Sequence, residues 1–80
     1  MSRDEIMEQV RRVLHELFEI EPDRVTLEAN LYTDLEIDSI DAVDLLDQIR
    51  RFTGRKVSGE DFRSVRTVAD LVAVIERLVA

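Results

Sequence analysis

Ser39 is the residue of this sequence best placed to do chemistry. It follows a loop, has Asp38 and Asp41 close beside it, and stands at the head of an apolar stripe. A serine hydroxyl acts as a nucleophile when a base lies nearby, and it is also a point at which another enzyme attaches a group. A phosphate ester at a helix start meets favourable backbone dipoles. The surroundings of Ser39 therefore decide which chemistry is open to it.

Hydrolysis by Ser39 itself finds little support in the sequence. The one histidine, His15, falls on a different predicted helix and is expected at the surface, and the Gly-x-Ser-x-Gly pattern of a nucleophile elbow is absent. Acidic side chains are abundant, but a thin helical core leaves little room for a substrate pocket. We therefore expect no catalytic residues and no enzymatic activity from the chain alone.

A calcium site is also unsupported, although Asp34-x-Glu36-x-Asp38 has the alternating acids that open an EF-hand loop. Such a loop needs glycine at its sixth position and a bidentate glutamate at its twelfth. Those positions hold Ser39 and Leu45. We expect no metal ligands.

The first predicted element is a helix that begins at Ser2, because Ser2-x-x-Glu5 has the form of a capping box. Pro22 should end this helix or follow its end. Residues 19–37 then form a long connection whose apolar residues indicate that it lies over the core. The expected apolar face of the helix is Ile6, Val10, Val13, Leu14, Leu17 and Phe18, and that of the connection is Val25, Leu27, Leu31 and Leu35.

Three further helices are predicted after the connection. One runs from about 39 to 52 and ends at Gly54 in a left-handed cap. A short helix near 59–64 is capped by Ser58, and Thr67 opens the last helix with a capping-type pattern. The expected inward residues of these last two are Phe62, Val68, Leu71, Val72, Ile75, Leu78 and Val79. No segment alternates with period two, so the expected fold is all-α: a small bundle of three longer helices and one short helix, in a single domain of residues 1–80.

The helix over 39–52 carries an apolar stripe and a row of acids. Ile40, Val43, Leu46 and Ile49 recur in steps of three, and Leu45 and Phe52 widen the stripe. Four aspartates lie beside the stripe with the same spacing: Asp38, Asp41, Asp44 and Asp47. Two capping arrangements remain open. Ser39 can cap the helix itself, or Asp38 can cap it and leave the Ser39 hydroxyl free.

The net charge of −7 is concentrated around this helix. No Lys or Arg occurs between Arg24 and Arg50, and that window holds seven of the 18 acids; the other 11 face 11 basic residues. Such a field disfavours nucleic acid and anionic membranes and favours basic protein partners. The alternative is a solvated face that only keeps the domain soluble. The seven acids are Glu28, Asp34, Glu36, Asp38, Asp41, Asp44 and Asp47.

Other features of the sequence indicate where in the cell the protein is located. It has no cysteine, its first residues are charged, and no apolar run approaches the ~20 residues that cross a bilayer. We expect a cytoplasmic, monomeric protein without a membrane span, and its methionine start and length of 80 residues indicate a stand-alone chain.

The segment Leu35-x-x-Asp38-Ser39-Ile40-Asp41, followed by Val43-Asp44-Leu45-Leu46, resembles the attachment motif of acyl carrier proteins. The resemblance extends over nearly the whole chain, in its order of helices, length and acidity. It implies that Ser39 is esterified by 4'-phosphopantetheine from coenzyme A, with Asp38 and Ile40 as motif neighbours. It implies too that this arm carries acyl intermediates as thioesters for fatty acid, polyketide or aryl polyene type biosynthesis. It also implies that Asp41, Asp44 and Asp47 lie on an acidic docking helix.

The partners implied by this resemblance are a phosphopantetheinyl transferase and ketosynthase, acyltransferase or acyl-ligase type enzymes with basic docking patches. Some residues depart from the family pattern. Ile40 replaces the usual leucine, Glu36 a frequent glycine, Asp47 an often apolar residue, and Arg50 and Arg51 frequent glutamates. They favour a specialised carrier for a polyketide, aryl polyene or lipid pathway over a housekeeping one. The alternative is a helical interaction module that docks through its acidic helix, with Ser39 only a cap.

Overall fold

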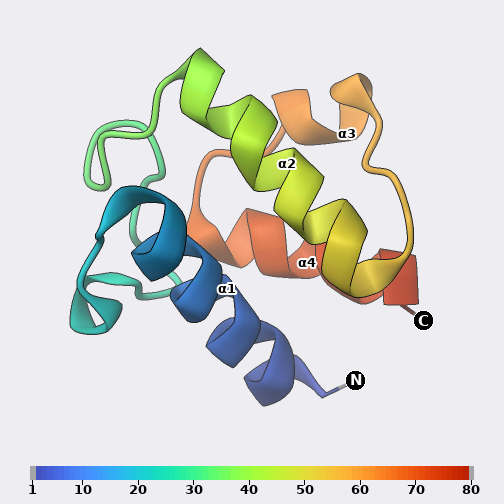
Figure 1. The fold of residues 1–80 in the computed structure, drawn as a ribbon, viewed down its shortest axis with the longest axis horizontal. Coiled ribbons are helices and arrows are strands. Elements are labelled where there is room, and N and C mark those ends of the chain that lie inside the picture. The colour runs from blue at the N-terminus through green and yellow to red at the C-terminus, as the bar shows by residue number, and fades with distance from the viewer. Residues whose placement is uncertain (1, 80) are drawn as a thin grey trace.

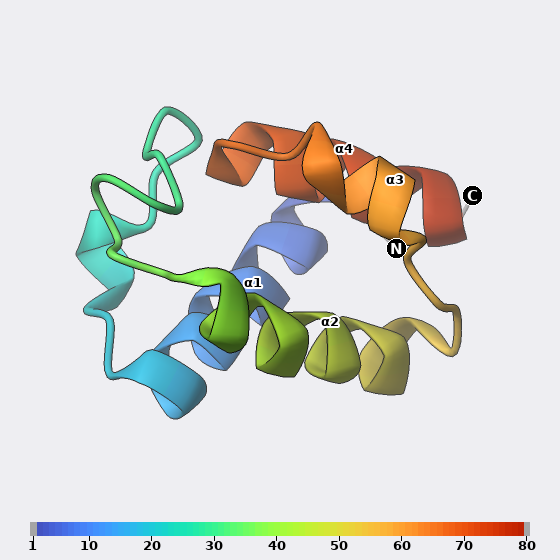
Figure 2. The same cartoon turned by 90° about the horizontal axis from the view of Figure 1, so that it is seen from above.

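The structure is a computed structural model that describes residues 2–79 (Figure 1). It contains the helices α1 (Arg3–Phe18), α2 (Ser39–Thr53), α3 (Gly59–Arg63) and α4 (Val68–Val79), with a 3-10 turn, η1 (Pro22–Arg24), after α1. Helix α1 packs against both α2 and α4, and α2 packs against α4. In Figure 2, α2 lies along one side of the bundle and α3 and α4 along the other. The predicted all-α fold of three longer helices and one short helix is confirmed.

The helix ends follow the local signals. The Ser2 hydroxyl accepts a hydrogen bond from the Glu5 amide at 3.2 Å, and the Glu5 carboxylate accepts one from the Ser2 amide at 3.0 Å, so the predicted capping box forms. Helix α2 ends at Gly54, whose φ of 73° is left-handed as expected. Helix α1 ends at Phe18, before Pro22. Pro22 thus follows the end of the helix, as predicted, and it starts η1, a turn that no local signal had indicated.

The long connection lies over the core, as predicted. Val25, Leu31 and Leu35 are buried and Leu27 is half-buried. Backbone hydrogen bonds also tie this connection to the start of α4: the amide of Leu31 donates to the carbonyl of Arg66 at 2.8 Å, and the amide of Val68 donates to the carbonyl of Ala29 at 3.0 Å. Within residues 2–79 the only β-type pairing is the isolated bridge between Asn30 and Thr67. The connection is therefore a fixed part of the bundle that delivers the chain to α2.

The apolar stripe of α2 does not form one face, which corrects the sequence interpretation. Leu45 and Ile49 are buried and Leu46 is half-buried, whereas Ile40 and Val43 are 76% and 65% exposed. With 3.6 residues per turn, each step of three falls about 60° short of a full turn. Three such steps rotate the direction by about 180°, so Ile40 and Ile49 point to opposite sides. The buried face of α2 is completed by Ala42.

Candidate functional site

Asp38, not Ser39, caps α2. Its carboxylate accepts hydrogen bonds from the amides of Ile40 and Asp41, both at 2.9 Å. The Asp41 carboxylate in turn accepts one from the Asp38 amide at 3.4 Å, which completes a capping box. The choice that the sequence left open is therefore settled in favour of Asp38. The alternative role of Ser39 as an ordinary helix cap is not what the structure shows.

Ser39 is consequently the first residue of the helix, and its side chain is exposed. Among the side-chain hydrogen bonds within residues 2–79, none involves the Ser39 hydroxyl. Its oxygen lies at the positive end of the helix dipole, which favours added negative charge, whereas the neighbouring carboxylates of Asp38 and Asp41 oppose it. An exposed hydroxyl that no fold contact uses is suited to carry a bulky substituent without disturbing the helix.

The loop before Ser39 is held in place by short-range hydrogen bonds. The Asn30 side-chain oxygen accepts from the amides of Tyr32 and Thr33 at 2.9 and 3.0 Å. The amide of Ile37 donates to the carbonyl of Leu31 at 2.9 Å. Because Leu31 and Ile37 are also buried, the chain enters α2 along a defined path. This path positions Ser39 on the outside of the bundle.

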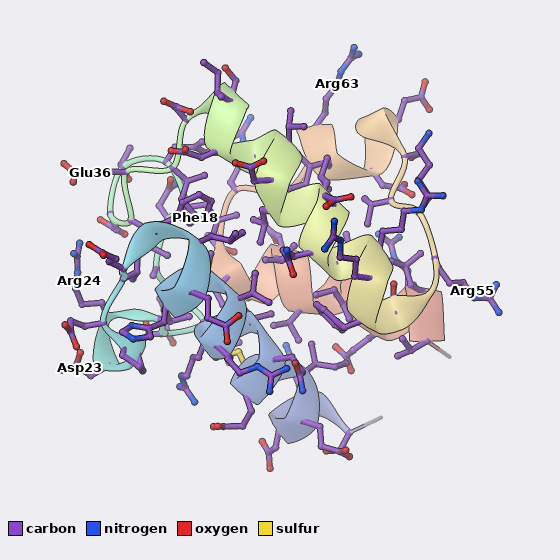
Figure 3. All side chains as sticks on the ribbon, in the orientation of Figure 1. Phe18, Asp23, Arg24, Glu36, Arg55 and Arg63 are labelled. Carbon is purple, nitrogen blue, oxygen red and sulfur yellow. The ribbon has the colours of Figure 1, made fainter. Side chains whose placement is uncertain are left out.

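Glu36 adopts an unusual backbone conformation in this loop. Its φ is 58°, in the left-handed region that disfavours residues with a Cβ atom. The residues on either side of it, Leu35 and Ile37, are buried, and the Glu36 side chain extends away from the protein (Figure 3). A glycine at this position would adopt the same positive φ without strain.

The predicted docking acids occupy different environments. Asp44 and Asp47 are exposed, and Asp47 forms an ion pair with Arg51 at 3.1 Å. Asp41 is half-buried, and its carboxylate belongs to the capping box. Val43 was not singled out as a surface residue, yet it is exposed beside Asp44. Counting 100° per residue from the buried positions would have found it.

His15 is exposed in the last turn of α1, as expected. Its Nδ1 lies 3.3 Å from the carbonyl oxygen of Ile20, so the ring is directed to the end of its own helix. No helix within residues 2–79 is long and apolar enough to cross a membrane.

Comparisons with known proteins agree on one family. Residues 8–75 match a family model described as the phosphopantetheine attachment site. Acyl carrier protein 2 of Ralstonia nicotianae is 46% identical over 80 residues, which cover 100% of this chain and 99% of the relative. The acyl carrier protein of Thermotoga maritima is 38% identical over 76 residues, which cover 95% of this chain and 94% of the relative.

A solved structure supports the same assignment. The acyl carrier protein of Enterococcus faecalis superposes with a TM-score of 0.77 at 32% identity, over 94% of this chain and 95% of that protein. Proteins of this kind work with biosynthetic enzymes and are not catalysts themselves. The chain therefore belongs to the acyl carrier protein family, whose members carry a covalently attached 4'-phosphopantetheine group.

Proposed function

We propose that Ser39 is the residue that carries the 4'-phosphopantetheine group. The Ser39 Oγ attacks the phosphorus atom that bears the pantetheine part of coenzyme A. A new oxygen–phosphorus ester bond forms, the pyrophosphate bond breaks, and 3',5'-adenosine bisphosphate leaves. The proton of the hydroxyl passes to a base on the phosphopantetheinyl transferase. The thiol at the end of the arm then carries acyl groups as thioesters.

One observation carries this proposal: Asp38 supplies the helix cap, so the neighbouring hydroxyl of Ser39 is exposed and unused by the fold. The positive end of α2 favours the phosphate that the reaction adds. We include in the same proposal that residues 1–80 form one carrier domain, which acts as a monomer in the cytoplasm. Asp38 and Ile40 are the neighbours that the transferase meets on each side of Ser39.

The test is an intact-mass spectrum after incubation with coenzyme A, magnesium and a broad-specificity phosphopantetheinyl transferase. We expect one added arm on the wild-type protein and none on Ser39→Ala. Circular dichroism of both proteins checks that each is folded. An arm added to Ser39→Ala, or no addition to well-folded wild-type protein, would contradict the proposal.

The docking surface forms the second part of the proposal. Asp44 and Asp47 are exposed beside Ile40 and Val43, so acidic and apolar groups lie together close to Ser39. Basic patches on the transferase and on later enzymes fit such a surface and gain association rate from it. The half-buried Asp41 contributes its negative charge while it keeps its place in the capping box.

Charge reversal at one of these positions tests the docking proposal. Asp44→Arg should lower the association rate with the transferase by about tenfold at low salt, with a smaller loss at high salt. Glu21→Arg is the matched control, because Glu21 is exposed in the loop before η1 and forms no side-chain cap. Equal rates for Asp44→Arg and the control would show that Asp44 is only solvated surface.

The pathway is the third part, and we propose a specialised carrier for a polyketide, aryl polyene or lipid pathway. The basic residues Arg50 and Arg51 on the docking helix support this, because the resemblance implies that fatty acid carriers often have glutamates there. Among the relatives is the meromycolate extension acyl carrier protein of Mycobacterium bovis, 35% identical over 78 residues, which cover 98% of this chain and 68% of the relative. In a panel of ketosynthases, preference for the general fatty acid enzyme would contradict a specialised role.

A further inference from the structure

The exposed side of α2 is a single ridge along the whole helix. Ile40, Val43, Asp44 and Asp47 are exposed on it, and the ridge continues to Arg50 and Arg51, which are exposed as well. At 100° per residue, the six positions fall within about 120° of one another around the helix axis, so they share one face. The buried residues Ala42, Leu45 and Ile49 lie on the opposite side. A partner that lies along this helix therefore meets all of the ridge.

The ridge changes sign along its length. Its first half carries the acids Asp44 and Asp47, and its second half runs into the basic cluster, which we define as Arg50, Arg51, Arg55 and Lys56. All four residues of the basic cluster are exposed, and no acid occurs between Asp47 and Glu60. Figure 3 shows the Arg55 side chain extending away from the body of the protein.

Most of this basic charge is not neutralised within the protein. Arg51 forms an ion pair with Asp47, but among residues 2–79 the side chains of Arg50, Arg55 and Lys56 form none. Helix stability does not require all four charges. The dipole of a helix favours cations within its last turn, which accounts for Arg50 and Arg51. Arg55 and Lys56 follow the cap at Gly54 and lie beyond that turn.

We propose that the enzyme that docks on α2 presents acidic side chains to the basic cluster, in addition to basic ones near Ser39. This inference rests on the proposed carrier function and names the chemistry of its partner. At 1.5 Å per residue, Arg51 lies about 18 Å along the helix from Ser39. A partner with basic side chains near Ser39 and acidic side chains at the basic cluster can bind in only one orientation. A partner that is basic throughout is repelled by the basic cluster. The net charge of −7 disfavours an anionic membrane as the occupant.

The direct experiment titrates the isotope-labelled protein, loaded with its arm, with a hexaglutamate peptide and follows the backbone amides by NMR. We expect the largest shifts at residues 50–56, their loss in Arg50→Glu/Arg51→Glu, and their retention in Arg12→Glu/Arg77→Glu. The control pair makes the same change in net charge on exposed residues of α1 and α4. Shifts centred on α1, or no shifts, would overturn the proposal. If Arg50→Glu/Arg51→Glu is unfolded, the test is repeated with Arg55→Glu/Lys56→Glu, because these two positions lie outside the helices.

A kinetic experiment tests the proposal on an enzyme. The probe is a ketosynthase chosen for a uniformly basic docking surface, which the basic cluster should repel. Arg50→Glu/Arg51→Glu should raise kcat/KM by about tenfold at low salt, and the control pair should not. An unchanged or lower kcat/KM would overturn the proposal, as would binding to phosphatidylglycerol vesicles that depends on Arg50 and Arg51. The mass of every variant is measured after loading, so a failure of Ser39 to accept the arm is seen separately.

Discussion

Three helices of this protein begin next to a serine, and the structure uses these serines in two different ways. At the starts of α1 and α3 the serine is the cap: Ser2 accepts from the amide of Glu5 at 3.2 Å and Ser58 from that of Asp61 at 3.0 Å. At the start of α2 the cap is Asp38, and Ser39 stands one position inside the helix. The first two hydroxyls accept capping hydrogen bonds, whereas that of Ser39 forms no hydrogen bond with any of residues 2–79.

At the start of α2, the residue that stabilises the helix end and the residue that is available for modification are two different residues. The oxygen of a capping serine is held against the first turn by the hydrogen bond that it accepts, so it must leave the cap to reach another enzyme. At α2 the carboxylate of Asp38 takes over that bond, so the adjacent hydroxyl is available to an enzyme. In the loop before α2, two residues ahead of the cap at Asp38, Glu36 is also left-handed.

Removal of the cap at α2 should have the largest effect on stability. Asp38→Ala takes away the acceptor for two amides, so the free energy of unfolding should fall by about 1–2 kcal/mol in urea titrations. Asp44→Ala is the control, because it removes the same charge from an exposed position of the same helix. The control should change stability by less than about 0.5 kcal/mol. Equal losses would show that charge, not capping, is the contribution of Asp38.

The serines should differ in the cost of their removal. Ser2→Ala and Ser58→Ala should each lower the free energy of unfolding by about 1 kcal/mol, because each removes a cap. Ser39→Ala should change it by less than about 0.5 kcal/mol, because its hydroxyl makes no hydrogen bond within the fold. The same urea titrations measure all three variants. A loss in Ser39→Ala as large as in the other two would assign Ser39 a capping role after all.

The loop before α2 should become more stable with glycine at position 36. Glu36→Gly relieves the left-handed strain, partly offset by greater freedom of the unfolded chain, for a net gain of about 0.5–1 kcal/mol. Glu36→Ala is the control, because it removes the same side-chain charge and keeps a Cβ atom. Thermal unfolding should show a higher Tm for the glycine variant alone. A gain of the same size in Glu36→Ala would attribute the effect to charge.

The start of α4 should give the smallest effect, and one that depends on pH. Hydrogen bonds from the amides of Arg66 and Thr67 hold the pKa of the Asp70 carboxyl below its ordinary value. Because this pKa is lowered, the ionised carboxylate stabilises the fold at pH values above the ordinary pKa of an aspartate, about 3.9. The stabilisation is lost as the pH falls through the pKa of the folded protein. At pH 7, Asp70→Asn should lower the free energy of unfolding by about 0.5 kcal/mol. The difference from wild type should shrink below about pH 4. A difference that is constant with pH would contradict this account.

The parts of the fold that depend on local signals could be predicted from the sequence. Capping boxes and a glycine cap placed the ends of the helices within about two residues, as at Ser2 and Gly54. The burial of Val25, Leu31 and Leu35 followed from their apolar character in a long connection. The family followed from the motif around Ser39 together with the order of helices.

Other features depend on contacts or angles that the local pattern does not contain. The hydrogen bond between Leu31 and Arg66 joins residues far apart in the sequence, so no local signal marks it. The apolar residues of α2 recur in steps of three, which suggested a single buried face. Each such step rotates the side-chain direction, so Ile40 and Val43 are exposed. The cap at α2 was ambiguous because aspartate and serine are equally good caps. One signal does separate them: Asp38 has a carboxylate three residues on, at Asp41, whereas Ser39 has Ala42 there.

The most direct test of the central claim is to locate the arm on the loaded protein by fragmentation mass spectrometry. The peptides that contain Ser2, Ser39 and Ser58 are distinguishable by sequence, and their hydroxyls differ in the way described above. We predict that the phosphopantetheine mass is found on Ser39 alone, with the Ser2 and Ser58 peptides unmodified. The arm on either capping serine, or spread over several, would contradict the claim that the cap at Asp38 frees one hydroxyl for attachment.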